Sequence, residues 1–187
     1  MDAYLEIRLR PDPEFMPTTL LNALFSKLHR GLLEHGGQSI GVSFPDVGKD
    51  GRSLGERLRL HGSKADLEQL MALNWMIGMR DHSTVNDIRQ VPAHAKPRVV
   101  RRVQAKSNPE RLRRRLIARK GISSEQAIQA IPDDKAKMLK LPYLILTSQS
   151  TGQQFHLFVE HLAVQKHAVE GVFSAYGLSS TATIPWF

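Results

Sequence analysis

Apolar side chains in the N-terminal half change their spacing in a fixed order, and this order constrains the fold more than any other feature of the chain. Residues 4–9 alternate between apolar and polar side chains, which is the period of a half-buried strand. A helical spacing then extends from Thr18 or Thr19, either of which can cap a first turn, to Glu34. The chain therefore begins with a strand followed by a long amphipathic helix.

Two short strands, a second helix and a weaker strand are expected next. Their marker residues are Ile40, Val42 and Phe44, then Leu58 and Leu60, then Leu67, Leu70 and Met71 in a helix opened by Ser63 and Asp66, and finally Val85, Ile88 and Val91. The resulting order β-α-β-β-α-β within about ninety residues is typical of a ferredoxin-like domain. We expect an α+β protein with this domain at residues 1–94 and a second, α/β domain at residues 95–187.

The second half contains a short helix rich in arginine, at residues 108–120. Ser107 or Asn108 can cap its first turn, Pro109 suits its first position, and Gly121 can end it in a left-handed conformation. At about 100° per residue one arc is basic and a narrow seam beside it is apolar. The arc holds Arg111, Arg114, Arg115 and Arg119 around Ala118, and the seam holds Leu112 and Leu116.

The positive charge of the chain is concentrated around this helix. Residues 95–120 hold 11 Lys or Arg and one acid, Glu110, so their net charge is +10, whereas the whole chain is +8. A basic helix face is often only a solvated surface. Here like charges gather without acids to balance them, which favours a polyanionic partner, and a pI near 10 favours nucleic acid over a membrane.

Secondary structure around the basic helix is expected to be mixed. Residues 95–106 are basic and extended, and residues 124–131 form a small helix that Pro132 ends. Three β-rich segments close the chain, at residues 143–147, 154–159 and 172–178.

The composition limits the cellular compartments in which the protein is expected. There is no cysteine, so a disulfide partner and thiolate zinc sites are excluded. The N-terminus shows no secretory leader, and the longest apolar stretch, at residues 141–146, is too short to span a bilayer. We expect a cytoplasmic protein without membrane contact.

No motif for metal or phosphate chemistry is present: the eight histidines show no paired spacing, and there is no Gly-rich phosphate loop. We therefore expect no metal and no cofactor. His29 lies at the flank of the first helix's apolar stripe, where it is either a packing residue or a base suited to neutral pH. Residues 148–152 supply hydroxyls for a turn or for a phosphate, and taken alone they favour a turn.

Considered together, several segments resemble the repeat-processing endoribonucleases of type I-F CRISPR systems. The segments are Tyr4-Leu-Glu-Ile-Arg-Leu-Arg-Pro-Asp-Pro-Glu-Phe15, Lys27-Leu-His29, Gly41-Val-Ser-Phe-Pro-Asp46, Arg102-Val-Gln-Ala-Lys-Ser-Asn-Pro-Glu-Arg-Leu-Arg-Arg-Arg-Leu116, Ser148-Gln-Ser-Thr-Gly-Gln153, Tyr176-Gly-Leu-Ser179 and Pro185-Trp-Phe187. The resemblance covers nearly the whole chain. It implies metal-independent cleavage of precursor CRISPR RNA at the base of the repeat hairpin, through the 2′-hydroxyl, with a 2′,3′-cyclic phosphate product. It also implies that the protein stays on the hairpin of the crRNA and joins other subunits of the type I-F surveillance complex.

The same resemblance implies site residues in this chain. His29 would act on the attacking 2′-hydroxyl, Ser148 would position the nucleotide with support from Ser150, and Tyr176 would orient the histidine. Arg102 and Gln104 would read bases at the foot of the stem, and Phe155 would stack on a base at the cut. Arginines at positions 111, 114, 115 and 119 would follow the major groove of the hairpin. Ala118 departs from the family pattern, since some relatives have a basic residue there.

Other classes of function fit the sequence less well, except one. A non-catalytic subunit that binds the same hairpin, in which His29 has no access to RNA, stays open. A sheet that binds RNA through stacked aromatics is disfavoured, because residues 56–61 lack those side chains. A DNA-binding module is disfavoured because neither dimerising heptads nor helix-turn-helix spacing is present.

Overall fold

The computed structural model describes residues 1–48, 53–104, 109–132, 139–148 and 151–187. Backbone contacts divide the chain into two compact units: residues 1–103 together with 141–187, and residues 104–140. Each unit is described by itself. Among the described residues, no helix combines the length and apolar character needed to cross a membrane. The expected domain division after residue 94 stays a prediction.

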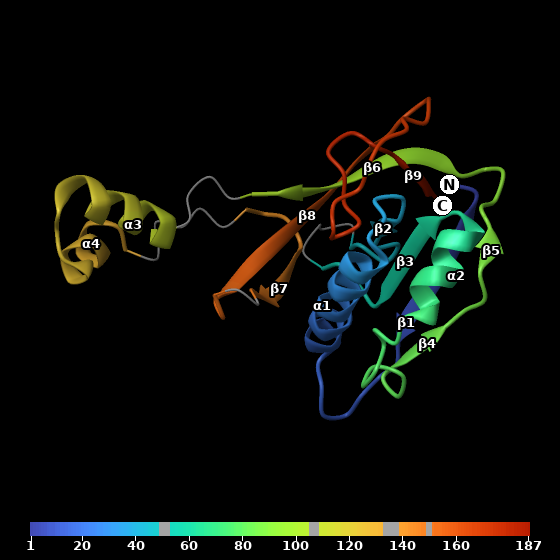
Figure 1. Cartoon of the computed structure of the whole chain (residues 1–187), viewed down its shortest axis with the longest axis horizontal. Helices are drawn as coiled ribbons and strands as arrows, with labels where there is room; N and C mark the ends of the chain where they lie inside the picture. The colour runs from blue at the N-terminus through green and yellow to red at the C-terminus, as the bar shows by residue number, and fades with distance from the viewer. Residues whose placement is uncertain (49–52, 105–108, 133–138, 149–150) are drawn as a thin grey trace. The chain divides into compact units, whose positions relative to one another are not determined.

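The first sheet of the larger unit has the ferredoxin-like order. Its strands are β1 (Ala3–Leu9), β2 (Gly41–Ser43), β3 (Arg57–Gly62), β4 (Ser83–Val85) and β5 (Arg89–Gln90), in the order β2-β3-β1-β4, with β5 also pairing with β1. All the pairings are antiparallel. Helices α1 (Pro17–His35) and α2 (Lys64–Ala72) cover one face (Figure 1). The expected β-α-β-β-α-β order and the α+β class are confirmed.

The last strand of this sheet differs from the expectation. The apolar positions Val85, Ile88 and Val91 predict one strand, but the structure has two short ones, β4 and β5. β4 pairs with the end of β1 and β5 with its start, and Asn86 donates its amide to Glu6 between them. Asn86 and Asp87 are turn-forming residues, which explains the interruption.

Helix α1 packs its apolar stripe onto the sheet. Leu24, Phe25 and Leu28 are fully buried in one core with the strand residues Ile7 and Leu58. Burying each such side chain contributes about 1.5–3 kcal/mol relative to leaving it exposed. The stripe thus fixes which face of α1 points into the protein and leaves His29 half-buried at its edge.

The ends of the helices show one correction. Helix α1 begins at Pro17 after Met16, without a side-chain cap, so the expected Thr18 or Thr19 cap is wrong; proline at the first position already lacks the amide that a cap would satisfy. The Ser63 cap of α2 is confirmed, since its hydroxyl accepts the Asp66 amide at 3.1 Å.

The second sheet of this unit contains β6 (Lys96–Val103), β7 (Tyr143–Thr147), β8 (Gln154–Val164) and β9 (Ile184–Trp186) in the order β7-β8-β6-β9. The strand expected at residues 172–178 is wrong. That segment is irregular: Gly177 has φ +66° and donates its amide to the Ser174 carbonyl. The closing strand is β9, which pairs with β6.

The C-terminal residues tie the two sheets together. The guanidinium of Arg59, from the first sheet, donates to the main-chain oxygen of Phe187 at 2.8 Å and lies 3.8 Å from the centroid of its ring. Phe187 also packs edge-on against Tyr4, and the two ends of the chain lie close together (Figure 1). Both sheets contribute to a single apolar core.

The smaller unit contains α3 (Pro109–Lys120) and α4 (Ser124–Ala130). Gly121 ends α3 with φ +63°, as expected, and Ser123 starts α4 with a capping box that includes Gln126. Arg113 of α3 donates from Nε to the Ile131 carbonyl at 2.8 Å, which joins the end of α4 to α3. The residues expected to cap α3, Ser107 and Asn108, lie outside the described residues.

Candidate functional site

His29 has one ring nitrogen fixed by the backbone of a distant segment. Its Nδ1 lies 2.8 Å from the carbonyl oxygen of Ala175. A carbonyl oxygen only accepts hydrogen bonds, so Nδ1 must carry the proton. In the neutral ring Nε2 is then the nitrogen that can take up another proton, which is what a general base requires.

Tyr176 holds the same imidazole by its ring. The two rings are stacked, with centroids 4.2 Å apart and planes 13° apart. The Tyr176 ring is also parallel to the ring of Phe25, which lies one helical turn before His29. The centroids of the Phe25 and Tyr176 rings are 6.4 Å apart. The imidazole is therefore held both through its Nδ1 atom and over its face.

The segment that supplies Ala175 and Tyr176 is anchored to the first sheet. The Val42 amide donates to the Gly177 carbonyl at 2.8 Å, and the Tyr176 amide donates to the Ser174 hydroxyl at 3.3 Å. A Cβ on Gly177 would lie 2.2 Å from Cγ2 of Val42, so only glycine fits here, at a φ that other residues rarely adopt. The strand β2 thus sets the position of the acceptor for His29.

Arg102 and Phe155 lie next to this pair. The Arg102 guanidinium carbon is 5.5 Å from the Tyr176 ring centroid and 5.6 Å from that of Phe155, within the range of cation–π contacts. Arg102 comes from β6 and is exposed, and Phe155 comes from β8 and is half-buried. The structure therefore gathers four of the expected site residues, His29, Tyr176, Arg102 and Phe155, from four separate parts of the chain.

Ser148 follows β7 and belongs to a turn. Its amide donates to the Gln153 carbonyl at 2.9 Å, and its carbonyl accepts the Gly152 amide at 2.8 Å. This backbone confirms the turn that the residue types favour, while the role of the Ser148 hydroxyl stays a prediction. Ser150 lies outside the described residues. Gln104 is exposed and falls in the smaller unit.

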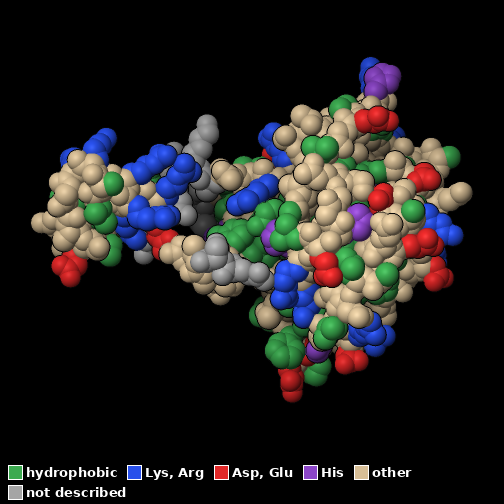
Figure 2. Space-filling model, in the orientation of Figure 1, with side chains coloured by type: hydrophobic (Ala, Val, Ile, Leu, Met, Phe, Trp, Pro, Cys, Tyr) green, Lys and Arg blue, Asp and Glu red, His purple; other side chains and the backbone are tan. Residues whose placement is uncertain are grey.

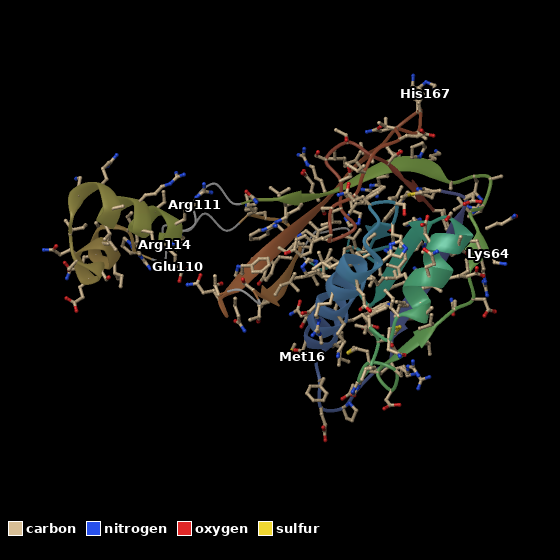
Figure 3. The ribbon with its side chains drawn as sticks, viewed as in Figure 1. Met16, Lys64, Glu110, Arg111, Arg114 and His167 are labelled. Carbon is tan, nitrogen blue, oxygen red and sulfur yellow. The ribbon has the colours of Figure 1, made fainter. Side chains whose placement is uncertain are left out.

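The basic arc of α3 is on the surface of the smaller unit. Arg111, Arg114, Arg115, Ala118 and Arg119 are all exposed, whereas Leu112 and Leu116 are half-buried. Figure 2 shows Lys and Arg side chains gathered over this helix, and Figure 3 shows Arg111 and Arg114 extending from it near Glu110. The expected amphipathic arrangement is confirmed, and it presents several guanidinium groups on one face.

One functional group could not be found from the sequence. The acceptor for His29 is a main-chain carbonyl 146 positions further along the chain, and any residue type has such a group. The position of Phe25 near His29 could have been predicted from the sequence, because it lies four residues before His29 on the same side of the helix. Among the described residues no group of three His, Asp or Glu gathers in a way that could hold a metal ion.

A fixed histidine beside an aromatic ring and an exposed arginine helix define a protein equipped for acid–base chemistry on a polyanion. The sequence model of a family described as CRISPR-associated protein (Cas_Csy4) matches residues 4–187. The chain is 54% identical to the CRISPR-associated endonuclease Cas6/Csy4 of Pseudomonas aeruginosa (strain UCBPP-PA14). It is 48% identical to the protein of the same name from Escherichia coli (strain UTI89 / UPEC). Both alignments cover 187 residues and the full length of each chain.

The chain therefore belongs to the Cas_Csy4 family of CRISPR-associated proteins and is an endonuclease. This confirms the family and the enzyme class that the resemblance implied.

Proposed function

We propose that this endonuclease is a metal-independent ribonuclease that binds the CRISPR repeat hairpin and cuts precursor CRISPR RNA at the base of the stem. The observation that carries the proposal is the contact of His29 Nδ1 with the Ala175 carbonyl at 2.8 Å. This contact leaves Nε2 as the only ring nitrogen available to a substrate. Cleavage of RNA without a metal needs such a base for the 2′-hydroxyl.

This arrangement supports the following reaction. Nε2 of His29 takes the proton of the 2′-hydroxyl of the nucleotide before the cut, and the 2′ oxygen attacks the adjacent phosphorus. The bond from phosphorus to the 5′ oxygen breaks, and that oxygen takes a proton from water and leaves as a 5′-hydroxyl. The other product ends in a 2′,3′-cyclic phosphate. The stacked Tyr176 ring keeps the imidazole in one orientation, which lowers the entropic cost of reaching the reactive geometry.

Ser148, with Ser150, would hold the nucleotide that carries the attacking hydroxyl. Arg102 and Gln104 would contact bases at the foot of the stem, since Arg and Gln side chains suit bidentate contacts with G and A. Phe155 would stack on the base at the cut. The position of Arg102 over the Phe155 ring supports a shared role for these two residues at one nucleotide.

The helix α3 would bind the hairpin through Arg111, Arg114, Arg115 and Arg119. An A-form major groove is deep and narrow, so the guanidinium groups would act near the end of the stem or on phosphates across the groove. Many such contacts would keep the product bound, and the protein would then remain on the 3′ hairpin as a subunit of the type I-F surveillance complex. A non-catalytic hairpin-binding subunit is the alternative.

A denaturing-gel assay with a type I-F repeat RNA in EDTA tests the proposal. The assay compares wild type with His29→Ala, and all-ribose RNA with RNA that has a 2′-deoxy sugar before the cut. We expect cleavage only by wild type and only of the all-ribose RNA. Affinity for the hairpin is measured separately. Tight binding together with no cleavage in any lane would favour the non-catalytic alternative, and absence of binding would contradict the assignment of the repeat as substrate.

A further inference from the structure

The strand β7 forms the outer edge of the second sheet and lies beside α1 (Figure 1). At Ile145 its backbone is held by a helix side chain: the Ile145 amide donates to Oδ1 of Asn22 at 3.0 Å. An amide on the open side of an edge strand has no neighbouring strand to accept it. Asn22 supplies that acceptor, so one side chain of α1 fixes one point of β7.

Asn22 lies on the same side of α1 as His29. The two residues are seven positions apart, which is about two helical turns. The bond from Asn22 reaches β7, and β7 leads to Ser148 three residues after Ile145. The helix that carries the proposed base therefore also holds the strand that leads to the proposed nucleotide-positioning serine.

Apolar packing alone would define the position of β7 relative to α1 less accurately. Leu144 and Leu146, on either side of Ile145, are 1% and 4% exposed and pack into the core that α1 shares. Apolar burial has no preferred direction, whereas a hydrogen bond weakens steeply when its angle changes. The bond from Ile145 to Asn22 is a directional contact between these two elements.

We propose that Asn22 is a positioning residue for cleavage: it fixes β7 against α1 and thereby sets Ser148 relative to His29. This inference rests on the proposed function, because it needs the roles of His29 and Ser148 given above. It assigns Asn22 no contact with RNA. Its effect is expected on the rate of the chemical step and not on affinity for the hairpin.

A purely protective role predicts something different. An edge strand needs its amides covered to avoid pairing with other chains, and Asn22 would then affect solubility or stability alone. The bond lies at an exposed position, so water can replace it, and its loss should lower the melting temperature by no more than about 2 °C. A change in cleavage rate at unchanged stability therefore separates positioning from protection.

The test measures the single-turnover cleavage rate with saturating repeat hairpin RNA, alongside hairpin affinity and melting temperature. Asn22→Ala should slow cleavage about tenfold, since small misplacements of reacting groups have effects of this size or larger. Asn22→Asp keeps the acceptor oxygen and should stay within about twofold of wild type. Glu34→Ala replaces a polar side chain of α1 that is exposed, whereas Asn22 is half-buried; it is the control and should have the wild-type rate.

A double variant tests the path through Ser148. If Asn22 acts by placing Ser148, then Asn22→Ala should cause no further loss in a Ser148→Ala background. Amide hydrogen exchange at Ile145 in the RNA-free protein reports the bond without any activity. It should be faster in Asn22→Ala than in wild type or Asn22→Asp.

Wild-type cleavage by Asn22→Ala, or full additivity with Ser148→Ala, would overturn the inference. Equal loss of rate in Asn22→Ala and Asn22→Asp, or unchanged exchange at Ile145, would overturn it as well. Absence of cleavage by wild type in the same assay is a separate result, because it removes the proposed function and this inference with it.

Discussion

The rings of His29 and Tyr176 lie nearly parallel, with centroids 4.2 Å apart and planes 13° apart. This contact and the bond from Nδ1 to the Ala175 carbonyl come from one short segment, residues 173–178. One segment thus fixes both the tilt of the imidazole and the nitrogen that carries its proton. The orientation of His29 depends on the anchoring of that segment as much as on α1.

Two substitutions of Tyr176 distinguish the contribution of its ring from that of its hydroxyl. Tyr176→Phe keeps the stacked ring, so we expect a single-turnover cleavage rate within about threefold of wild type. Tyr176→Leu loses the aromatic pair, worth about 0.5–1.5 kcal/mol, and should slow cleavage about two- to tenfold. The rates are measured with saturating hairpin RNA in EDTA. An equal loss in both variants would show that the hydroxyl, and not stacking, is the important group.

Substitution of Gly177 should displace the acceptor for His29. Gly177→Ala combines a φ of +66° with a clash against Val42, and we expect a loss of about 1–3 kcal/mol in the free energy of unfolding together with a cleavage defect. Gly36→Ala is the matched control: its φ is +72°, but no atom of the part of the chain that the structure describes lies within 4 Å of the added Cβ. It should lose stability only. Urea unfolding and the cleavage assay check both variants, and a cleavage defect of the same size in Gly36→Ala would contradict the argument.

The regular elements could be predicted because their burial is periodic. The alternation of β1 and the stripe of α1 leave one arrangement that buries both, and the exposed arc of α3 follows from the same helical count. In these elements the local sequence and the packing agree.

The irregular segment that holds His29 could not be predicted. Phe173 and Leu178 are buried and resemble a strand pattern, but Val172 is 66% exposed and Gly177 has a left-handed backbone. Its conformation depends on two main-chain hydrogen bonds, from the Phe173 amide to the Gln38 carbonyl and from the Val42 amide to the Gly177 carbonyl. Gln38 lies just before β2, and Val42 lies within it. The Ala175 carbonyl has no side-chain signal, so only the three-dimensional structure connects it with His29.

Buried histidines make stability depend on pH. Burial, with a smaller effect of Arg98, lowers the pKa of His161 from 6.5 to about 4, and its Nδ1 has no hydrogen-bond partner among the described residues. Burial also lowers the pKa of His61 well below 6.5. Between pH 6.5 and about 4 the unfolded chain therefore binds more protons than the folded one. Stability from these groups is complete above pH 6.5 and falls as the pH falls through that window.

For His161 the expected loss between pH 6.5 and 5 is about 1.5 kcal/mol in the free energy of unfolding. Urea unfolding of wild type and His161→Gln at both pH values measures it. The variant should lose less stability on acidification, and the remaining dependence should come from His61 and from carboxylates. Identical losses in the two proteins would show that His161 is not the source.

The catalytic and binding residues should separate in a comparison of single variants. His29→Ala should abolish cleavage while leaving hairpin affinity within a few-fold. Arg115→Ala should cost about 1–3 kcal/mol of binding free energy if Arg115 contacts a base. Arg89→Ala, an exposed arginine in β5, is the control for loss of one charge and should bind like wild type. Equal losses of affinity in His29→Ala and Arg115→Ala would contradict this division of roles.

Position 118 offers the opposite test, a gain of affinity. Ala118 is exposed in the middle of the basic arc of α3, so Ala118→Arg adds a guanidinium where four others already lie. Each new phosphate contact releases counterions, so hairpin binding should tighten at low salt. The slope of log affinity against log salt should steepen by about 0.7–0.9. Ala65→Arg adds the same charge at an exposed alanine of α2 and should leave the slope unchanged. Filter binding across a salt series distinguishes the two. Equal slopes for the two variants would mean that overall charge, and not the arc of α3, determines binding.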